Sequence, residues 1–347
     1  MNWDTPTQSV LGQLTLLSLP GIGKTTSPRL AERYFSLGEI PDASEAGIAE
    51  LATGRGRKSL QEKPLWEAAF DNAQRVLDSA IEHRAQVVCL FDPDYPQLLK
   101  EIPDAPPILY IKGVLRQSVR NVACVGTRHP SWFGTEVARR IVKVLASNGY
   151  GIVSGLATGI DSEAHQAAVE TNSYTVAILA NGLDSVYPSE NRGLAHIIIE
   201  KGGALISEQP FGARAFAQNL IERDRLQSGM SLGTFVFQTD VVGGTMHTIR
   251  YTLMQERMLF APVPPPPYAD EDKSRGIRAI IEQHGPELAD RLKATGSYRD
   301  LLTTRYRDRA PAFGIRGVSD YEAVIARLAG SVLDAESRRN RSGPNPS

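Results

Sequence analysis

Residues 121–134 read NVACVGTRHPSWFG, and residues 135–165 continue TEVARRIVKVLASNGYGIVSGLATGIDSEAH. The run 121–125 is short, mostly apolar and partly β-branched, which is typical of a strand buried on both faces. A polar loop follows it, and from residue 134 to 148 apolar side chains recur at helical spacing. A second strand at residues 150–153 then leads through SGLATGID into a second helix near residue 161. These residues predict two strand, loop and helix units in succession.

The alternation continues to about residue 255. Strand patterns at residues 175–180, 204–207 and 234–238 alternate with helical patterns at residues 190–201, 224–229 and 245–255. Such a sequence predicts an α/β fold, with a doubly wound, mainly parallel sheet and helices on both faces. The polar loops then meet at the carboxyl edge of the sheet. Free backbone N–H groups and helix N-termini at that edge suit phosphate groups.

Composition limits the class of protein. The chain has 347 residues, a formal net charge of −1 and two cysteines, Cys89 and Cys124. Both cysteines lie in apolar runs, which favours buried, unreactive thiols and leaves no metal cluster or disulfide framework. The balanced charge means that a site for a polyanion must be local. No apolar run is long enough to span a membrane, so we expect a cytoplasmic protein without a cofactor.

The N-terminal region, residues 1–84, is expected to be a small helical domain. Two short helices within residues 7–38 flank the turn LPGIGKTT, with Ser27 as the cap of the second helix. The string GKT does not complete a phosphate-binding P-loop, because Ser18 stands where that loop needs glycine. The turn is typical of a helix-hairpin-helix, whose backbone N–H groups approach nucleic-acid phosphates. A plain helical hairpin remains an equal alternative.

The rest of the chain flanks the sheet. Apolar runs at residues 87–91 and 108–111, joined by a proline-rich connection, are expected to add edge strands to a central domain at residues 85–262. Prolines after residue 261 indicate a linker at residues 263–273. A small, mainly helical region is expected at residues 274–333. The polar residues 334–347 are expected to be a disordered tail.

Four motifs carry a family resemblance: GTRHPSWFG, SGLATGIDSEAH, GLDSVYPSEN and LISEQP. In this order and spacing they resemble the DprA/Smf family of DNA-processing proteins. The resemblance covers about residues 85–262 closely and implies a Rossmann-like central domain. It also implies a dimer that binds single-stranded DNA and helps to load a RecA-like recombinase during DNA uptake, without being an enzyme.

Phosphate contacts are expected first from the loop after residue 125. Arg128 can fork onto a phosphate, with the hydroxyls of Thr127 and Ser131 beside it. The alternative for Arg128 is an ion pair with a loop carboxylate such as Asp161. The second loop offers Ser154, Gly155 and Gly159 for close backbone approach. Asp161 and His165 are expected to bond to each other and hold that loop in shape, with direct contact or acid–base chemistry as the alternative.

Further candidates follow later in the chain. Asp184 and Tyr187 are assigned to loop shaping, although Tyr187 could stack on a base. Arg223 and Arg225 match a family stretch in which two arginines flank an asparagine. Here Asp224 stands between them, and its charge would partly neutralise a phosphate site. The turn with Gly243, Gly244 and Thr245 is expected to bind an anion at a helix start, with a simple tight turn as an equal alternative.

These residues support three possible functions. The first is a non-enzymatic, cytoplasmic protein that binds single-stranded DNA. The second is a pocket that senses or hydrolyses a nucleotide. The third is a DprA-like component of a phage-defence system, in which the fold serves as an interaction platform. Related hydrolases carry a glutamate within one turn of the glycine-rich loop. In this chain the first glutamate after Gly244 is Glu256. The first function is therefore favoured.

Overall fold

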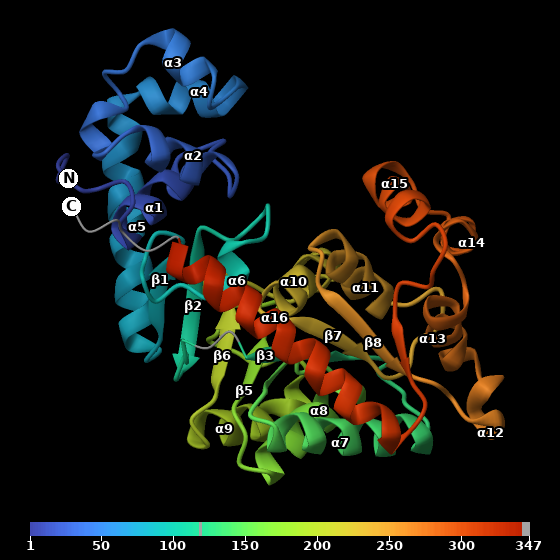
Figure 1. Cartoon of the computed structure of the whole chain (residues 1–347). Helices are drawn as coiled ribbons and strands as arrows, with labels where there is room; N and C mark the ends of the chain where they lie inside the picture. Colours follow the sequence, from blue (N-terminus) through green and yellow to red (C-terminus); the bar gives the residue numbers. More distant parts are fainter. Residues whose placement is uncertain (118–119, 342–347) are drawn as a thin grey trace.

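Figure 1 shows the computed structural model, which describes residues 1–117 and 120–341. Within these residues nine strands form a single sheet, in the order β1-β2-β6-β5-β4-β3-β7-β8-β9. The strands are β1 Gln86–Cys89, β2 Ile108–Gly113, β3 Asn121–Val125, β4 Gly151–Ser154, β5 Thr175–Ile178, β6 Ala204–Ser207, β7 Gly233–Val236, β8 Met258–Pro262 and β9 Phe313–Ile315.

The sheet confirms the α/β fold class. All pairings from β6 through β9 are parallel, whereas β1 and β2 pair antiparallel at one edge. The sequence predicts these edge strands but not their direction. The chain enters the parallel part of the sheet at β3, moves outward through β4, β5 and β6, and returns to place β7 on the other side of β3. The reversal of strand order falls between β3 and β7. In doubly wound sheets, ligands bind outside the carboxyl ends of the strands at such a point.

Both faces of the sheet are covered by helices. Neighbouring residues of one strand, such as Cys124 and Val125, point into different hydrophobic clusters, because side chains alternate along a strand. This double burial explains why the strands read as continuous apolar runs. The helices after β2 are α7 Trp132–Ser147, α8 Ile160–Glu170, α9 Arg192–Glu200, α10 Ala217–Gly229, α11 Thr245–Met254, α12 Pro266–Ala269, α13 Asp272–Glu282, α14 Gly285–Arg291, α15 Gly296–Arg305 and α16 Tyr321–Arg341.

Five helices precede the sheet and have a core of their own around the buried Trp66. They are α1 Val10–Ser18, α2 Thr26–Arg33, α3 Glu45–Ala49, α4 Gly54–Gln61 and α5 Lys63–Glu82; the short α6, Gln97–Lys100, lies between β1 and β2. The expected pair of short helices is present. However, α2 begins at Thr26 and Ser27 is buried inside it, so the prediction of Ser27 as the cap is wrong.

The turn between α1 and α2 makes its contacts within the chain. The ammonium group of Lys24 lies 3.1 Å from a carboxylate oxygen of Glu208 and 3.5 Å from one of Glu222. Gly21 lies against Gly56 of α4, where an added Cβ would come within 2.5 Å of the Gly56 nitrogen. The turn is thus packed between the helical region and the sheet.

The C-terminal region joins the sheet more closely than expected. Its strand β9 pairs with β8, and α16 buries Leu328 and Val332 in the cluster that also contains Val122 of β3. The expected disorder from residue 334 is wrong as far as Arg341, where α16 ends, because Ala335 is buried in the same cluster. Residues 342–347 of that predicted tail lie outside the described residues. Within residues 1–117 and 120–341, no helix combines the length and hydropathy that crossing a membrane requires.

Candidate phosphate-binding site

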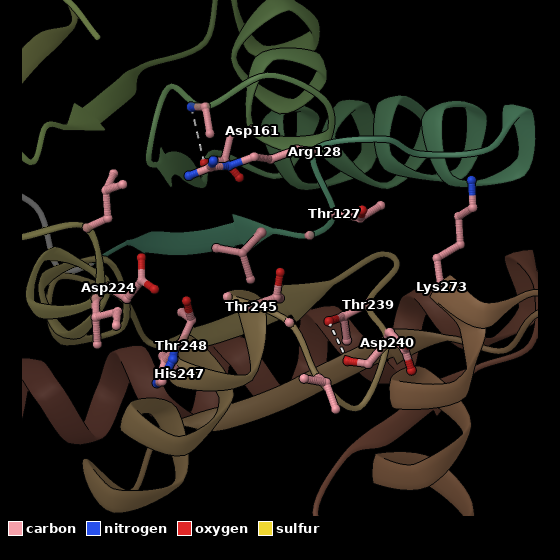
Figure 2. A pocket seen from close by; sticks show the side chains of 18 of the residues that line it. Thr127, Arg128, Asp161, Asp224, Thr239, Asp240, Thr245, His247, Thr248 and Lys273 are labelled. Carbon is pink, nitrogen blue, oxygen red and sulfur yellow. Dashed lines mark hydrogen bonds between the residues drawn. The ribbon is translucent and has the colours of Figure 1, made fainter. Parts of the chain in front are cut away.

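A crevice of about 690 Å³ opens where the strand order reverses. Its walls come from the loop after β3, the loop after β7, and helices α10, α11 and α13. Figure 2 shows Arg128 beside the crevice, with Asp224 and Lys273 toward its two ends. The loops predicted to meet at the carboxyl edge therefore do so, around a cavity large enough for part of a polymer chain.

Arg128 is the cationic side chain best placed to meet a ligand. It is exposed, and the structure gives it no hydrogen bond or ion pair within residues 1–117 and 120–341. Arg128 forms no ion pair with Asp161 in this part of the chain, so the alternative given for Arg128 is not observed. An arginine presents five donors in a planar fork that matches a phosphate. The guanidinium of Arg128 thus has donors free for a ligand.

The neighbouring hydroxyls serve the loop itself. The Thr127 hydroxyl accepts a bond from the His129 N–H at 3.2 Å, and the Thr127 N–H donates to the Gln238 carbonyl at 2.7 Å. The hydroxyl of Ser131 accepts from the Gln238 side-chain amide at 2.9 Å. These bonds join the β3 loop to the end of β7. Thr127 lines the crevice, whereas Ser131 does not.

The second loop is held from within by Asp161. Its carboxylate accepts bonds from the N–H groups of Gly155 at 3.1 Å and Ala157 at 3.4 Å. The Ser154 hydroxyl is fully buried and donates to the Cys124 carbonyl at 2.6 Å, so it does not reach the crevice. Asp161 thus occupies the loop-shaping position that its place in the sequence indicates.

Gly159 brings the two loops together. Its φ is +80°, and an added Cβ would lie 2.5 Å from the Thr127 carbonyl oxygen and 2.6 Å from the Arg128 carbonyl carbon. L-residues with a side chain strongly disfavour this backbone region. A glycine at this position therefore allows the second loop to lie directly against the loop that carries Arg128.

His165 is not a partner of Asp161. Its Nδ1 lies 2.7 Å from the Thr175 hydroxyl, which donates to the Ile152 carbonyl, so Nδ1 is assigned as the donor to Thr175. Burial and the nearby Arg223 lower the pKa of His165 to about 3, which keeps the ring neutral. The expected bond to Asp161 is wrong. His165 instead links α8 to β5 inside the core.

Arg223 lines the crevice, but most of its guanidinium is engaged within the chain. It is only 5% exposed; Nη1 donates to the carbonyls of Gly155, at 2.6 Å, and Ile178, and Nε donates to Asp224 at 3.3 Å. These bonds satisfy carbonyls at the ends of β4 and β5 that would otherwise be buried without a partner. The arrangement gives Arg223 a structural role in the crevice wall.

Arg225 points away from the crevice. Two of its nitrogens donate to the two carboxylate oxygens of Glu208, at 3.1 and 2.8 Å, and Nε donates to Asp104 at 2.8 Å. The residue is 5% exposed and does not line the crevice. The sequence places it two residues after Arg223, and residues two apart on a helix face different directions. The structure therefore does not bring Arg225 to the expected phosphate site.

Asp224 faces the crevice, and its surroundings disfavour its charge. Burial raises the pKa of Asp224 to about 6 against the opposing attraction of Arg223, and the neighbouring Asp161 adds to the rise. Burial likewise raises the pKa of Asp161 above its ordinary value. Both carboxyl groups line the crevice, and their raised pKa values mean that each gives up its negative charge at a higher pH than an ordinary aspartate does.

The turn after β7 supplies the opposite wall. Gly243, Gly244 and Thr245 all line the crevice, and Thr245 begins α11. Lys273, which the sequence places in a linker, also lines it and donates to the His129 carbonyl at 3.0 Å. No sequence signal indicates this contribution. It depends on α13 packing against the β7 loop.

The third group of predicted residues lies at the side. Tyr187 is 46% exposed and borders a smaller adjoining cavity of about 120 Å³ with Arg128 and Thr158. Asp184 accepts a bond from the Gly212 N–H at 2.7 Å and does not line either cavity. Asp184 therefore joins two surface loops, whereas Tyr187 stands close enough to Arg128 to meet the same ligand.

The sequence of this chain matches a known protein family. The sequence profile of DNA recombination-mediator protein A matches residues 86–295. The chain belongs to this family. The match confirms the DprA/Smf resemblance and extends beyond residue 262, where the sequence places the end of the central domain.

Individual relatives agree with this family assignment. DNA processing protein DprA of Bacillus subtilis is 34% identical over 247 residues, covering 71% of this chain and 82% of the relative. Protein Smf of Synechocystis sp. is 35% identical over 246 residues, covering 70% of this chain. The chain spans 61% of that relative and 45% of Protein Smf of Escherichia coli.

A solved structure shows the same fold. DprA from Streptococcus pneumoniae aligns with a TM-score of 0.61 at 24% identity, over 80% of this chain and 99% of that one. DprA from Helicobacter pylori, whose structure is described for its single-stranded DNA binding mode, aligns with a TM-score of 0.51 at 23% identity, over 65% of this chain and 97% of that one.

Proposed function

We propose that this protein binds single-stranded DNA, with the backbone phosphates of the strand lying in the crevice. The observation that carries the proposal is the free guanidinium of Arg128 beside a cavity at the reversal of strand order. Lys273 adds a second cation, and the Gly243 and Gly244 turn adds exposed backbone. A strand is favoured over a single nucleotide because residues that line the crevice extend from Asp224 on one side to Lys273 on the other (Figure 2).

Membership of the DNA recombination-mediator protein A family supports this proposal. The Helicobacter pylori relative, which has the same fold, is described as binding single-stranded DNA. We extend the proposal to a role in DNA uptake and recombination, in which a homodimer in the cytoplasm protects the strand and assists a RecA-like recombinase. The protein would act by binding and not as an enzyme.

Fluorescence anisotropy of a labelled oligo-dT strand, titrated with the protein at several salt concentrations, tests the proposal. We expect affinity to fall steeply with salt, because bound phosphates release their counterions. Arg128→Ala should lower affinity by about tenfold to a hundredfold, the equivalent of one charge-assisted bond, and should reduce the salt slope by about one. Its melting temperature should not change, since the side chain is exposed.

Arg75→Ala is the matched control. Arg75 is an exposed arginine on α5 that has no ion pair within the described residues. It makes the same change in net charge away from the crevice and should leave affinity unchanged. Equal losses in both variants would show that only overall charge matters. Absence of binding by the unmodified protein at low salt would contradict the proposed function itself.

A further inference from the structure

An exposed aromatic side chain stands at the start of α7, next to the crevice loop. Trp132 is 69% exposed, although an indole ring is among the side chains that gain most from burial. It follows Arg128 by four residues in the same polar loop. A large apolar group held in solvent beside a cationic site is typical of a contact surface for a ligand.

Two further rings hold this position in place. Tyr268 of α12 stacks on Phe133, with ring centroids 5.2 Å apart, and on Trp132, with centroids 6.4 Å apart. The three rings form what we call the aromatic platform: Trp132, Phe133 and Tyr268. One side of it comes from the loop after β3 and the other from the segment after β8. Only the folded chain brings these two segments together.

The platform is connected to the crevice by hydrogen bonds on both segments. Lys273, five residues after Tyr268, donates to the carbonyl of His129 at 3.0 Å. The side-chain amide of Gln238 donates both to the Ser131 hydroxyl, at 2.9 Å, and to the Glu271 carboxylate, at 3.1 Å. The platform therefore has a defined position relative to the crevice wall.

Two cations beside the platform, Lys273 and Arg128, are available to an anionic ligand. Lys273 has no ion pair within the described part of the chain, and neither has Arg128. Of the nearby carboxylates, Glu271 accepts from Gln238, and Asp272 is paired with Arg275. Flat apolar rings next to two unpaired cations match the chemistry of a nucleotide, which joins a flat base to a phosphate.

We propose that the aromatic platform stacks a base of the single strand whose phosphates lie at Arg128 and Lys273. This inference rests on the proposed function and adds a base contact to it. Every base has a π-face, so such a contact strengthens binding without selecting sequence. Because Tyr268 already packs against Trp132, little side-chain freedom is lost when a base binds.

The test compares an oligo-dT strand with an abasic strand of the same length and charge. Trp132→Ala and Tyr268→Ala should each lower affinity for oligo-dT by roughly fivefold to a hundredfold, the range for one stacked base, and leave affinity for the abasic strand unchanged. Trp132→Phe should retain part of the affinity. Phe35→Ala, which removes an aromatic ring that is 77% exposed in the helical region, is the matched control and should have no effect.

Intrinsic fluorescence gives an independent readout. The chain has three tryptophans, and the other two, Trp3 and Trp66, pack against each other in the helical region. Oligo-dT should therefore quench the emission of Trp132 by stacking, whereas the abasic strand should not. Trp132→Phe should abolish the quench.

The outcomes separate the platform from the crevice. Undiminished oligo-dT affinity in Trp132→Ala, beside a loss in Arg128→Ala, would overturn the platform and leave the proposed function standing. Equal losses for both strands would show that Trp132 only supports the loop, which also overturns it. If the unmodified protein binds neither strand, the proposed function and the platform fall together.

Discussion

At the residue scale, three arginines of this chain have different roles because their surroundings differ. Arg128 is exposed and unpaired within the described residues, whereas Arg223 and Arg225 are each 5% exposed and bonded to groups of the same chain. Burying a guanidinium is costly unless acceptors satisfy it, so carbonyls and carboxylates surround both buried ones. The exposed arginine is the one that keeps its whole guanidinium for a ligand.

The raised pKa of Asp224 leads us to expect that DNA binding depends on pH. Arg223, Gln227, Thr248 and Asp161 are the groups that act on it, and burial raises the pKa of Asp224 to about 6. A bound phosphate would disfavour the anion further, so the DNA complex should hold this proton more tightly than the free protein does. Affinity should therefore fall as pH rises through about 6, by up to about tenfold for each unit by which binding raises the pKa.

Anisotropy titrations between pH 5 and 8, on the unmodified protein and on Asp224→Asn, measure this effect. The variant should bind more tightly at pH 7.5 and depend less on pH. The crevice histidines are present in both proteins, so the difference between the two profiles reports the carboxyl group alone. Identical pH profiles would show that Asp224 does not sense the bound strand.

At the element scale, the crevice depends on two loops in direct contact at Gly159. Gly159→Ala places a Cβ within 2.5 Å of the Thr127 carbonyl oxygen at a φ of +80°. We expect the free energy of unfolding to fall by about 2–3 kcal/mol, the scale of a strained backbone position. We also expect weaker binding of oligo-dT, because the loop carrying Arg128 must move. Urea denaturation and the anisotropy titration measure the two effects.

Gly244→Ala provides the stability control. An added Cβ at Gly244 has no atom within 4 Å, and its φ of −54° suits any residue. Its free energy of unfolding should stay within about 0.5 kcal/mol of the unmodified protein. A loss as large as that of Gly159→Ala would mean that alanine is unfavourable at glycine positions in general, and not because these two loops touch.

At the scale of the whole molecule, the C-terminal helix is part of the sheet domain. Leu328 is fully buried in the cluster that contains strand β3, whereas Leu333 of the same helix is 66% exposed. Leu328→Ala should lower the free energy of unfolding by about 2–5 kcal/mol, because it leaves a cavity under α16. Leu333→Ala should change it by no more than about 0.5 kcal/mol.

Thermal and urea unfolding of both variants check this prediction. If α16 were only docked on the surface, Leu328→Ala would release the helix at low denaturant and leave the main transition in place. A single transition shifted to lower denaturant would show that α16 and the sheet unfold together. In that case the C-terminal region belongs to the same cooperative unit as β3.

Much of the fold can be predicted from the sequence because its signals are local. Strands buried on both faces read as apolar runs, and the helices between them show their own period, so the parallel sheet and its edge strands follow directly. The C-terminal region has weaker signals. Strand β9 is only three residues long, so it is not evident without the strand that it pairs with. The helical region predicted at residues 274–333 includes the start of α16, but its continuation to Arg341 depends on the surface that it covers.

The sequence by itself determined the family, the α/β alternation and the loops that meet at the carboxyl edge, since each depends on neighbouring residues. It also singled out Arg128. The tertiary structure decided which side chains face the crevice. It directs Arg225 toward Glu208, Arg223 toward the carbonyl of Gly155, and His165 toward Thr175. It also brings Lys273 and Tyr268 to the segment that follows β3. The physical reason is that burial and pairing depend on contacts between segments far apart in the chain, which no local pattern encodes.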